Sequence, residues 1–482
     1  MQEELCSTPI PMVLIDFTDP YKQRGPCCFS PNARFLAAAV DYRLVIRDVV
    51  SLKVVQLYTC VDKISYIEWA LDSEYVLCGL YKRPIIQAWS ITQPEWTCKI
   101  DDGPAGIAYA RWSPDSRHIL TTSDFHLRLT VWSLLSTACV HMQWPKHASK
   151  CVSFTRDGKF AAICTRRDGK DYINLLSCHT WEVMGTFSVD TIDLSGIEWS
   201  PDDSSLVIWD SPIEYKVLIY SPDGRCLFKY QAYESGLGVK TVSWSPCGQY
   251  LVVGSYDQML RAFNHLTWKN FAEFMHAPTL RNPCAATVFK EVDELLQLDV
   301  SELYLNDEFT HDMKGSHPEN IAEGQLVKYK VIDLPITVPT QKPAADKPNP
   351  KQGIGLLSWS RDSQYVFSRN DSMPNVLWVW DILHLKLAAV LIQKEAIRIA
   401  AWDPTCSRIV MCTGNSQLYI WSPTRACCVC VPIPNFVVSD LKWSSDGSHL
   451  LLKDQDHFCC ASMIPSIPDP KEEEISVSSE GD

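Results

Sequence analysis

The sequence predicts an all-β protein, a WD40-type β-propeller with nine blade-like repeats. An aromatic residue followed by a Ser-Pro-Asp type of turn recurs along the chain, and each copy contains short β-rich runs separated by polar turns. Successive aromatic residues lie 40, 43, 42, 45, 45, 115, 43 and 41 residues apart. A period of about 40 to 45 residues is typical of a four-stranded propeller blade. The recurring aromatic residues, termed anchors below, are Phe29, Trp69, Trp112, Phe154, Trp199, Trp244, Trp359, Trp402 and Trp443.

The copy around Trp244 explains why one repeat forms a blade. Apolar and polar residues alternate from 239 to 244, which predicts a strand with one buried face. The next four residues, Ser-Pro-Cys-Gly, form a tight turn because proline fixes φ and glycine accepts a positive φ. Residues 250–254 and 260–263 then provide two apolar strands, and residues 270–274 an outer one. A single blade would expose apolar surface, so neighbouring blades must cover it.

The two ends of the chain are expected to complete one blade together. The propeller is predicted to span residues 16–290 (blades 1 to 6 and a closing strand) and 351–463 (blades 7 to 9). The last repeat ends after its third strand, so the N-terminal strand should pair there and remove both sheet edges. Residues 1–15 are interpreted as an extension and residues 464–482 as an acidic disordered tail. A single ring is favoured over a smaller ring with extra repeats outside it.

One interval between anchors is too long for a single blade. Residues 291–325 contain ten acidic residues and one lysine, and residues 333–350 are rich in proline. We expect residues 291–350 to form a largely disordered insertion, acidic and then proline-rich. Strand-like pieces at 287–289 and 327–332 are expected to rejoin the sheet at its ends.

Composition argues against several functional classes. The net charge of −13 and the pI of about 5.4 disfavour nucleic acid and anionic membranes as ligands. No run approaches the roughly 20 apolar residues of a membrane span, and no signal peptide is apparent, so a cytoplasmic or nuclear location is expected. Most of the 20 cysteines lie in apolar runs, where a thiol acts as a small hydrophobic group. Cys427 and Cys430 form a CxxC without a second pair, so zinc is not expected.

Catalytic motifs are missing from the sequence. There is no P-loop, Gly-x-Gly-x-x-Gly, nucleophile elbow or His-Glu-x-x-His. The carboxylates that follow the anchors recur at one place in separate repeats, so we interpret them as turn residues. No enzyme activity, cofactor or metal is therefore predicted. These carboxylates are Asp115, Asp157, Asp202, Asp362 and Asp446.

The turns between the second and third strands of the blades form the candidate partner-binding face. In propellers these turns emerge on one side, and here they are rich in tyrosine and arginine, which concentrate binding energy at interfaces. The candidate contact residues are Tyr42, Arg43, Tyr81, Lys82, Arg83, Phe125, His126, Arg166, Arg167, Glu214, Tyr215, Tyr256 and Arg369.

Several stretches that propeller geometry does not require resemble the WD-repeat-containing protein 8 family. They are residues 42–49, 56–60, 93–96, 98–101, 125–128, 130–134, 254–257, 264–265, 267–269, 349–351, 353–355 and 378–381. The resemblance implies a non-catalytic scaffold at the centrosome, centriolar satellites and spindle pole. It also implies a coiled-coil anchoring partner of the afadin-DIL-domain-interacting type, together with a minus-end-directed kinesin and pericentriolar proteins. The implied processes are spindle microtubule anchoring, spindle assembly and cilium formation.

Two other functions stay open on the sequence alone. A ribosome- or RNA-associated propeller resembling a translation factor would need basic clusters, and the chain offers only Lys82-Arg83 and Arg166-Arg167 against 57 acidic residues. A substrate-receptor subunit of an enzyme complex is also compatible with the absence of catalytic motifs.

Overall fold

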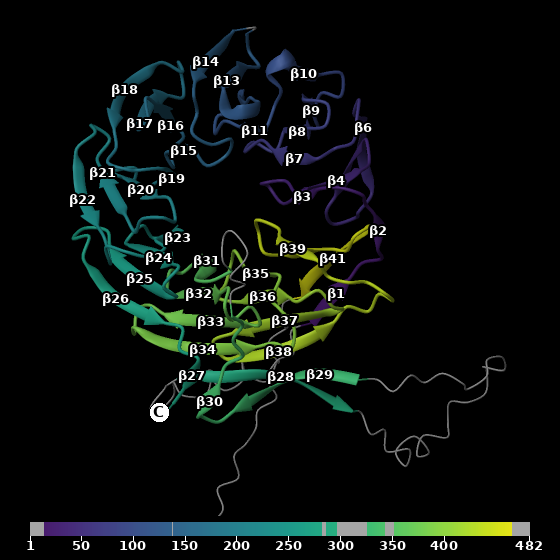
Figure 1. Ribbon diagram of the computed structural model, residues 1–482. Coiled ribbons are helices and arrows are strands. Elements are labelled where there is room, and N and C mark those ends of the chain that lie inside the picture. Colours follow the sequence, from purple (N-terminus) through teal and green to yellow (C-terminus); the bar gives the residue numbers. More distant parts are fainter. Residues whose placement is uncertain (1–13, 137, 282–285, 296–324, 343–350, 465–482) are drawn as a thin grey trace, which may run out of the picture. The chain divides into compact units, whose positions relative to one another are not determined.

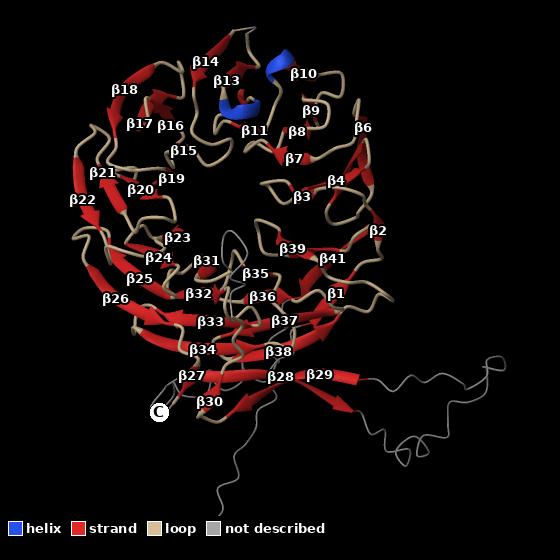
Figure 2. Cartoon of the chain, viewed as in Figure 1, coloured by secondary structure: helices blue, strands red, loops and turns tan. Residues whose placement is uncertain are grey.

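The computed structural model describes residues 14–136, 138–281, 286–295, 325–342 and 351–464 (Figure 1). In these ranges the chain is almost entirely strand and turn, with two short 3-10 turns, η1 (Gly103–Ala105) and η2 (Asp124–His126) (Figure 2). Their strands form nine blade sheets, which confirms the predicted number of repeats, and one separate pair. By its internal contacts the chain divides into unit 1 (Met1–Val239, Asp403–Cys406, Val431–Asp482) and unit 2 (Lys240–Trp402, Ser407–Cys430).

Unit 1 contains blades 1 to 5 and blade 9, each an antiparallel sheet. Blade 1 is β3 (Cys27–Phe29), β4 (Phe35–Val40), β5 (Arg43–Asp48) and β6 (Val54–Thr59). Blade 2 is β7 (Tyr66–Trp69), β8 (Tyr75–Leu80), β9 (Ile85–Ser90) and β10 (Thr97–Asp101). Blade 3 is β11 (Tyr109–Trp112), β12 (His118–Thr122), β13 (Arg128–Ser133) and β14 (Cys139–Gln143). Blade 4 is β15 (Val152–Phe154), β16 (Phe160–Arg167), β17 (Lys170–Ser177) and β18 (Val183–Ser188). Blade 5 is β19 (Leu194–Trp199), β20 (Leu206–Asp210), β21 (Val217–Tyr220) and β22 (Cys226–Tyr230).

Blade 9 takes strands from both ends of the sequence. It consists of β39 (Asp440–Trp443), β40 (His449–Lys453) and β41 (His457–Ile464), and β1 (Leu14–Phe17) pairs antiparallel with β41. The short strand β2 (Tyr21–Lys22) pairs with the same β41. Residues 14 and 15, assigned from the sequence to an extension, are therefore part of a blade. Residues 1–13 and 465–482 lie outside the described residues.

Unit 2 contains blades 6 to 8, apart from the first residue of β23. Blade 6 is β23 (Val239–Trp244), β24 (Tyr250–Ser255), β25 (Met259–Asn264) and β26 (Asn270–Met275). Blade 7 is β31 (Ile354–Trp359), β32 (Tyr365–Asn370), β33 (Val376–Asp381) and β34 (Lys386–Ile392). Blade 8 is β35 (Ile399–Trp402), β36 (Ile409–Cys412), β37 (Gln417–Ser422) and β38 (Arg425–Cys430).

Blade 7 carries two additional strands, which include the strand-like pieces expected at 287–289 and 327–332 and extend beyond them into the predicted insertion. β28 (Thr287–Leu295) pairs parallel with β34, and β29 (Gln325–Ile332) pairs antiparallel with β28. A second pair joins β27 (Thr279–Leu280) to β30 (Ile336–Thr337). Ordered strands thus extend into both ends of the predicted insertion, whose residues 296–324 and 343–350 lie outside the described residues.

Contacts with blade 8 explain why these strands form despite the acidic composition. Phe289 and Tyr329 pack against the apolar cluster that includes Tyr419 of β37. Glu291 is buried, and its carboxylate accepts hydrogen bonds from the Tyr419 hydroxyl and the Lys394 amide, both at 2.8 Å. The acidic composition suggests that Glu291 is exposed to solvent. In the structure its carboxylate instead links β28 to Lys394 and to Tyr419 of β37, all within unit 2.

The turns after the anchors have one recurring hydrogen-bond pattern. In blade 3 the Ser113 hydroxyl bonds to the Asp115 carboxylate and accepts from the His118 amide at 3.1 Å. The Asp115 carboxylate also accepts from the amide of Arg117 at 2.9 Å. The equivalent carboxylates Asp157, Asp202, Asp362 and Asp446 bond to the hydroxyl two residues earlier in the same way. The predicted structural role of these carboxylates is confirmed.

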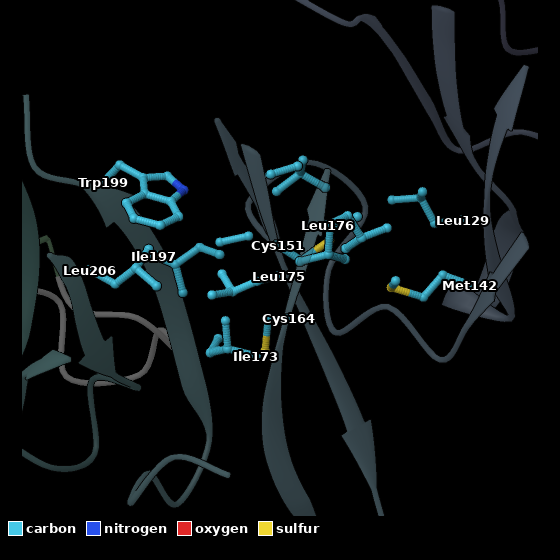
Figure 3. Close-up of a cluster of buried hydrophobic side chains, with 14 of the residues drawn as sticks. Leu129, Met142, Cys151, Cys164, Ile173, Leu175, Leu176, Ile197, Trp199 and Leu206 are labelled. Carbon is cyan, nitrogen blue, oxygen red and sulfur yellow. The ribbon is translucent and has the colours of Figure 1, made fainter. Parts of the chain in front are cut away.

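The core lies between neighbouring blades. Figure 3 shows Cys151, Cys164 and Ile173 of blade 4 with Leu129 and Met142 of blade 3 on one side. On the other side the same cluster continues to Ile197, Trp199 and Leu206 of blade 5. Cys151 and Cys164 are fully buried, as expected for thiols that act as small hydrophobic groups. Because both faces of blade 4 are covered, its second strand is a nearly continuous apolar run.

Candidate protein-binding surface

The turn between β4 and β5 in blade 1 presents an exposed aromatic and an exposed arginine. The turn is tight because Asp41 adopts a positive φ of 57°. It leaves Tyr42 47% exposed, with the Arg43 guanidinium 5.6 Å from the centre of its ring. Further exposed bases lie at the equivalent turns of blades 2 and 4. Within the described chain, none of these bases forms an ion pair: Arg43, Lys82, Arg83 and Arg167.

The equivalent turn of blade 3 exposes the most apolar side chain of this set. Phe125 is 92% exposed, and both Phe125 and His126 adopt positive φ values of 57° and 54°. For residues other than glycine this conformation costs about 1–2 kcal/mol, because Cβ approaches a backbone carbonyl. The His126 ring lies edge-on to the His147 ring, with centroids 6.5 Å apart. The turn thus holds a phenyl ring in solvent at an energetic cost.

Of the tyrosines predicted at the surface, two lie inside the protein and a third is half-buried. In unit 1, Tyr215 is only 1% exposed and contacts the rings of Tyr230 and Tyr233 edge-on. In the same unit, Tyr81 is half-buried against the Tyr66 ring. In unit 2, Tyr256 is 8% exposed. Tyr215 and Tyr256 therefore offer almost no area to a partner, because neighbouring loops cover turns that the sequence alone cannot distinguish from open ones.

The remaining predicted residues are engaged within the chain. In unit 1, the Arg166 guanidinium lies 3.3 Å from the Asp171 carboxylate and donates to the carbonyl of Ile192 at 3.1 Å. The Glu214 carboxylate lies 3.3 Å from the ammonium of Lys216. In unit 2, Arg369 donates to the carbonyl of Ile397 and to the carboxylate of Asp371. These side chains brace loops and are not free contacts.

Two fully buried carboxylates, which the sequence analysis does not single out, fix the loop between blades 4 and 5. Asp210 accepts hydrogen bonds from the amides of Ile192 and Asp193, both at 2.8 Å. From the other side, Asp171 accepts from the Leu194 amide at 2.8 Å and the Thr191 hydroxyl at 3.0 Å. A carboxylate at the end of an apolar strand, as in Leu206–Asp210, is the sequence signal that could have indicated this role.

On the same ends of blades 3 to 5, exposed apolar side chains other than the predicted Phe125 were also missed. Main-chain hydrogen bonds connect their loops: the amide of Trp144 donates to the carbonyl of Leu127, and the amide of Gly238 donates to the carbonyl of Pro212. Apolar residues in loops follow no period, so no sequence pattern marks them. We term this set the apolar ridge: Phe125, Leu127, Trp144, Ile192, Ile213 and Leu237.

Across the described ranges, no group of three or more His, Cys, Asp or Glu residues could hold a metal ion. The same ranges contain no helix long and apolar enough to cross a membrane. A groove of about 500 Å³ in unit 1 is lined by Asp115, His118 and Trp181 among others. Burial raises the pKa of Asp115, but hydrogen bonds from His118 and Ser113 outweigh it and lower the pKa to about 2. This carboxylate is therefore an ionised turn residue and not a proton donor near neutral pH.

Comparison with known proteins agrees with the fold. The WD domain, G-beta repeat family matches residues 224–264. The solved C-terminal WD40 domain of Sif2 superimposes with a TM-score of 0.50 over 94% of this chain and 99% of that chain, at 11% identity. WD40 propellers are generally non-catalytic scaffolds, and no catalytic family is identified among these matches.

Two relatives are informative. An uncharacterised WD repeat-containing protein of Schizosaccharomyces pombe is 26% identical over 73% of this chain and 70% of its own length. The WD repeat-containing protein WRAP73 of Mus musculus is 45% identical over 453 residues, which cover 92% of this chain and 95% of the relative. The assignment to the WD-repeat-containing protein 8 family made from the sequence is therefore corrected. At this identity and coverage, the chain belongs to the family of WD repeat-containing protein WRAP73.

Proposed function

We propose that this chain is a non-catalytic scaffold of the centrosome, centriolar satellites and spindle pole that holds a coiled-coil anchoring protein of the afadin-DIL-domain-interacting type. In this proposal a minus-end-directed kinesin and pericentriolar proteins join the same assembly. The assembly would anchor spindle microtubules and support spindle assembly and cilium formation. The coarser role, that of a WD40 propeller scaffold, follows from the fold and the family.

The observation that carries the proposal is the set of exposed bases at the turns of blades 1, 2 and 4. Arg43, Lys82, Arg83 and Arg167 lie in solvent and form no ion pair with the described residues, although the chain has a net charge of −13. Surface charges that stay unpaired in an acidic protein are available to an acidic partner. Coiled coils present rows of such charges, often glutamate, beside their apolar seam.

The experiment compares two charge-reversal variants, one at the candidate turns and one at the turns on the opposite ends of the blades. The variant Arg43→Glu/Arg83→Glu/Arg167→Glu is expected to lose at least tenfold in co-precipitation of the coiled-coil partner, and the tagged chain should lose its focus at spindle poles. The control Lys53→Glu/Arg156→Glu/Lys269→Glu changes exposed bases at the opposite turns and should behave as the wild type. Unchanged partner recovery with the first variant would remove these turns from the proposal. A diffuse wild-type signal throughout mitosis would refute the centrosomal role.

A further inference from the structure

The apolar ridge of blades 3 to 5 is rigid and unusually exposed. Phe125 and Ile213 are 92% and 78% exposed, and Ile192 and Trp144 are 59% and 50% exposed. Single exposed apolar residues are common on protein surfaces, but a contiguous set marks an interaction site. Figure 1 shows that blades 3, 4 and 5 follow one another within unit 1, so the loops that carry these side chains belong to consecutive blades.

The backbone beneath the ridge is held in place from several sides. The amide of Arg166 donates to the carbonyl of Trp144 at 3.0 Å, and the Arg166 guanidinium donates to the carbonyl of Ile192. Trp144 adopts a positive φ of 58°, as Phe125 does at 57°. Two large aromatic residues in the left-handed region, each kept in solvent, indicate that the fold maintains this arrangement against its conformational cost. Such a preorganised surface loses little entropy when a partner binds.

The main chain of the ridge favours a helical partner over an extended one. An added strand needs free carbonyls and amides for pairing. Here the carbonyls of Leu127, Trp144 and Ile192 already accept hydrogen bonds from Trp144, Arg166 and the Arg166 side chain, respectively. A helix satisfies its own main chain and offers a stripe of side chains at i, i+3, i+4 and i+7, which suits a row of apolar contacts.

Charges at the middle of the ridge favour an acidic partner. In the loops of blades 3 to 5 on this side, the exposed residues without an ion pair in the described chain are three bases and three carboxylates. The bases, Lys150, Arg167 and Lys170, all border blade 4, and so does the carboxylate Asp168, whereas Asp124 and Glu234 belong to blades 3 and 5. The positive excess therefore lies at blade 4, the middle blade of the ridge, although the whole chain is strongly negative.

We infer that the apolar ridge is the docking site for an amphipathic helix whose apolar stripe is flanked by acidic residues. This inference rests on the proposed scaffold function and names the element of a partner that one part of the surface recognises. Phe125, Ile192 and Ile213 provide the apolar contacts, while Lys150 and Arg167 receive the acidic flank. Trp144 has the largest side chain of the ridge and adds a further apolar contact.

The test measures binding of a designed peptide to the purified full chain by fluorescence anisotropy. The probe is a labelled, helix-stabilised 21-residue peptide with leucines at i, i+3, i+4 and i+7 and glutamates beside them. One comparator replaces the glutamates with lysines, and another scrambles the stripe at constant composition. The acidic amphipathic peptide should bind at least tenfold more tightly than either comparator, with an affinity that falls as salt rises.

Matched variants locate the site. Phe125→Ser/Ile192→Ser/Ile213→Ser should weaken binding at least tenfold, and Lys150→Glu/Arg167→Glu should weaken it severalfold and reduce its salt dependence. The control Val50→Ser/Leu135→Ser/Leu266→Ser removes equally exposed apolar side chains from turns at the other end of their blades and should bind as the wild type. Because every substituted side chain is mostly exposed, thermal melting should be unchanged.

Equal binding of the wild type and the ridge variant, or equal binding of the glutamate and lysine peptides, would overturn the inference. The proposed function fails separately. Peptide binding at the ridge in a chain that never reaches spindle poles would support the inference and contradict the centrosomal role. Normal polar localisation and partner recovery by the ridge variant would contradict the inference alone.

Discussion

The indole nitrogen of Trp112 in blade 3 donates a hydrogen bond to the main-chain carbonyl of Glu68 in blade 2, at 3.2 Å. In return, the Glu68 carboxylate accepts from the Trp112 amide at 3.1 Å. Four other Trp anchors donate the same indole hydrogen bond to a main-chain carbonyl of the preceding blade, in each case within one unit. In unit 1 the pairs are Trp69 with Cys28 and Trp199 with Ser153, and in unit 2 they are Trp359 with Ser243 and Trp402 with Ser358. The anchors therefore join blades as well as filling the core.

The anchor bond predicts a measurable loss of stability in Trp112→Phe. Phenylalanine stands at two other anchors, Phe29 and Phe154, so it fits the position but cannot donate. The substitution removes the indole donor to the Glu68 carbonyl and opens a small cavity, and it should cost about 2–4 kcal/mol in urea unfolding. Trp144→Phe changes an indole that is 50% exposed and should cost less than about 0.5 kcal/mol. If both substitutions lower the free energy of unfolding equally, the Trp112 indole does not stabilise the contact between blades 2 and 3.

The same pair predicts a pH dependence of stability. Burial raises the pKa of Glu68 to about 7, although Arg111 and the Trp112 amide partly oppose it. Since the folded pKa lies above the ordinary value of 4.5, the protonated carboxyl favours the folded state. Its stabilising effect is complete below about pH 4.5 and is lost as pH rises through about 7.

Glu68→Gln should therefore flatten the stability profile between pH 5 and 8, where the wild type is expected to lose up to about 3 kcal/mol from this group. Thermal melting across this range measures the effect. Burial also raises the pKa of Glu198 to about 7, so Glu198 should contribute a similar pH dependence of stability. Glu198→Gln should remove that contribution. Glu182→Gln changes an exposed carboxyl and should keep the wild-type profile. If the stability of Glu68→Gln varies with pH as that of the wild type does, Glu68 is not the source of this pH dependence.

Buried Asp210 predicts a link between loop order and ridge binding. Asp210→Ala leaves the amides of Ile192 and Asp193 without their acceptor and should cost about 2–4 kcal/mol in unfolding free energy. Hydrogen exchange of residues 190–194 should accelerate, and the amphipathic peptide should bind more weakly because Ile192 is no longer held. Asp168→Ala removes an exposed carboxylate nearby and serves as the control. Slow exchange in Asp210→Ala would show that other contacts hold this loop.

The periodic features of this protein were predictable, and the aperiodic ones were not. Anchors such as Trp112 and turn residues such as Asp115 repeat with the blade, so their structural role follows from the pattern. Tyr215 occupies the same kind of turn as the exposed Tyr42, yet it is buried because the chain near Tyr233 covers it. Long-range packing between loops of different length decides such cases, and a repeat pattern contains no information about it. Trp144 was missed for the same reason.

The contact between Glu291 and Tyr419 predicts how firmly β28 and β29 are held on blade 8. Tyr419→Phe removes one donor to the buried Glu291 carboxylate, while the Lys394 amide continues to donate. A buried acceptor that loses one of its hydrogen bonds should cost about 1–3 kcal/mol. Because the weakened contact lies between these strands and blade 8, limited proteolysis should cut near β29 severalfold faster before the blades unfold. Tyr42→Phe, at an exposed site in blade 1, should leave the cleavage rate unchanged. If Tyr419→Phe instead unfolds as one unit with no early cleavage, β28 and β29 are as stable as the blades, and their apolar contacts through Phe289 and Tyr329 are sufficient to hold them.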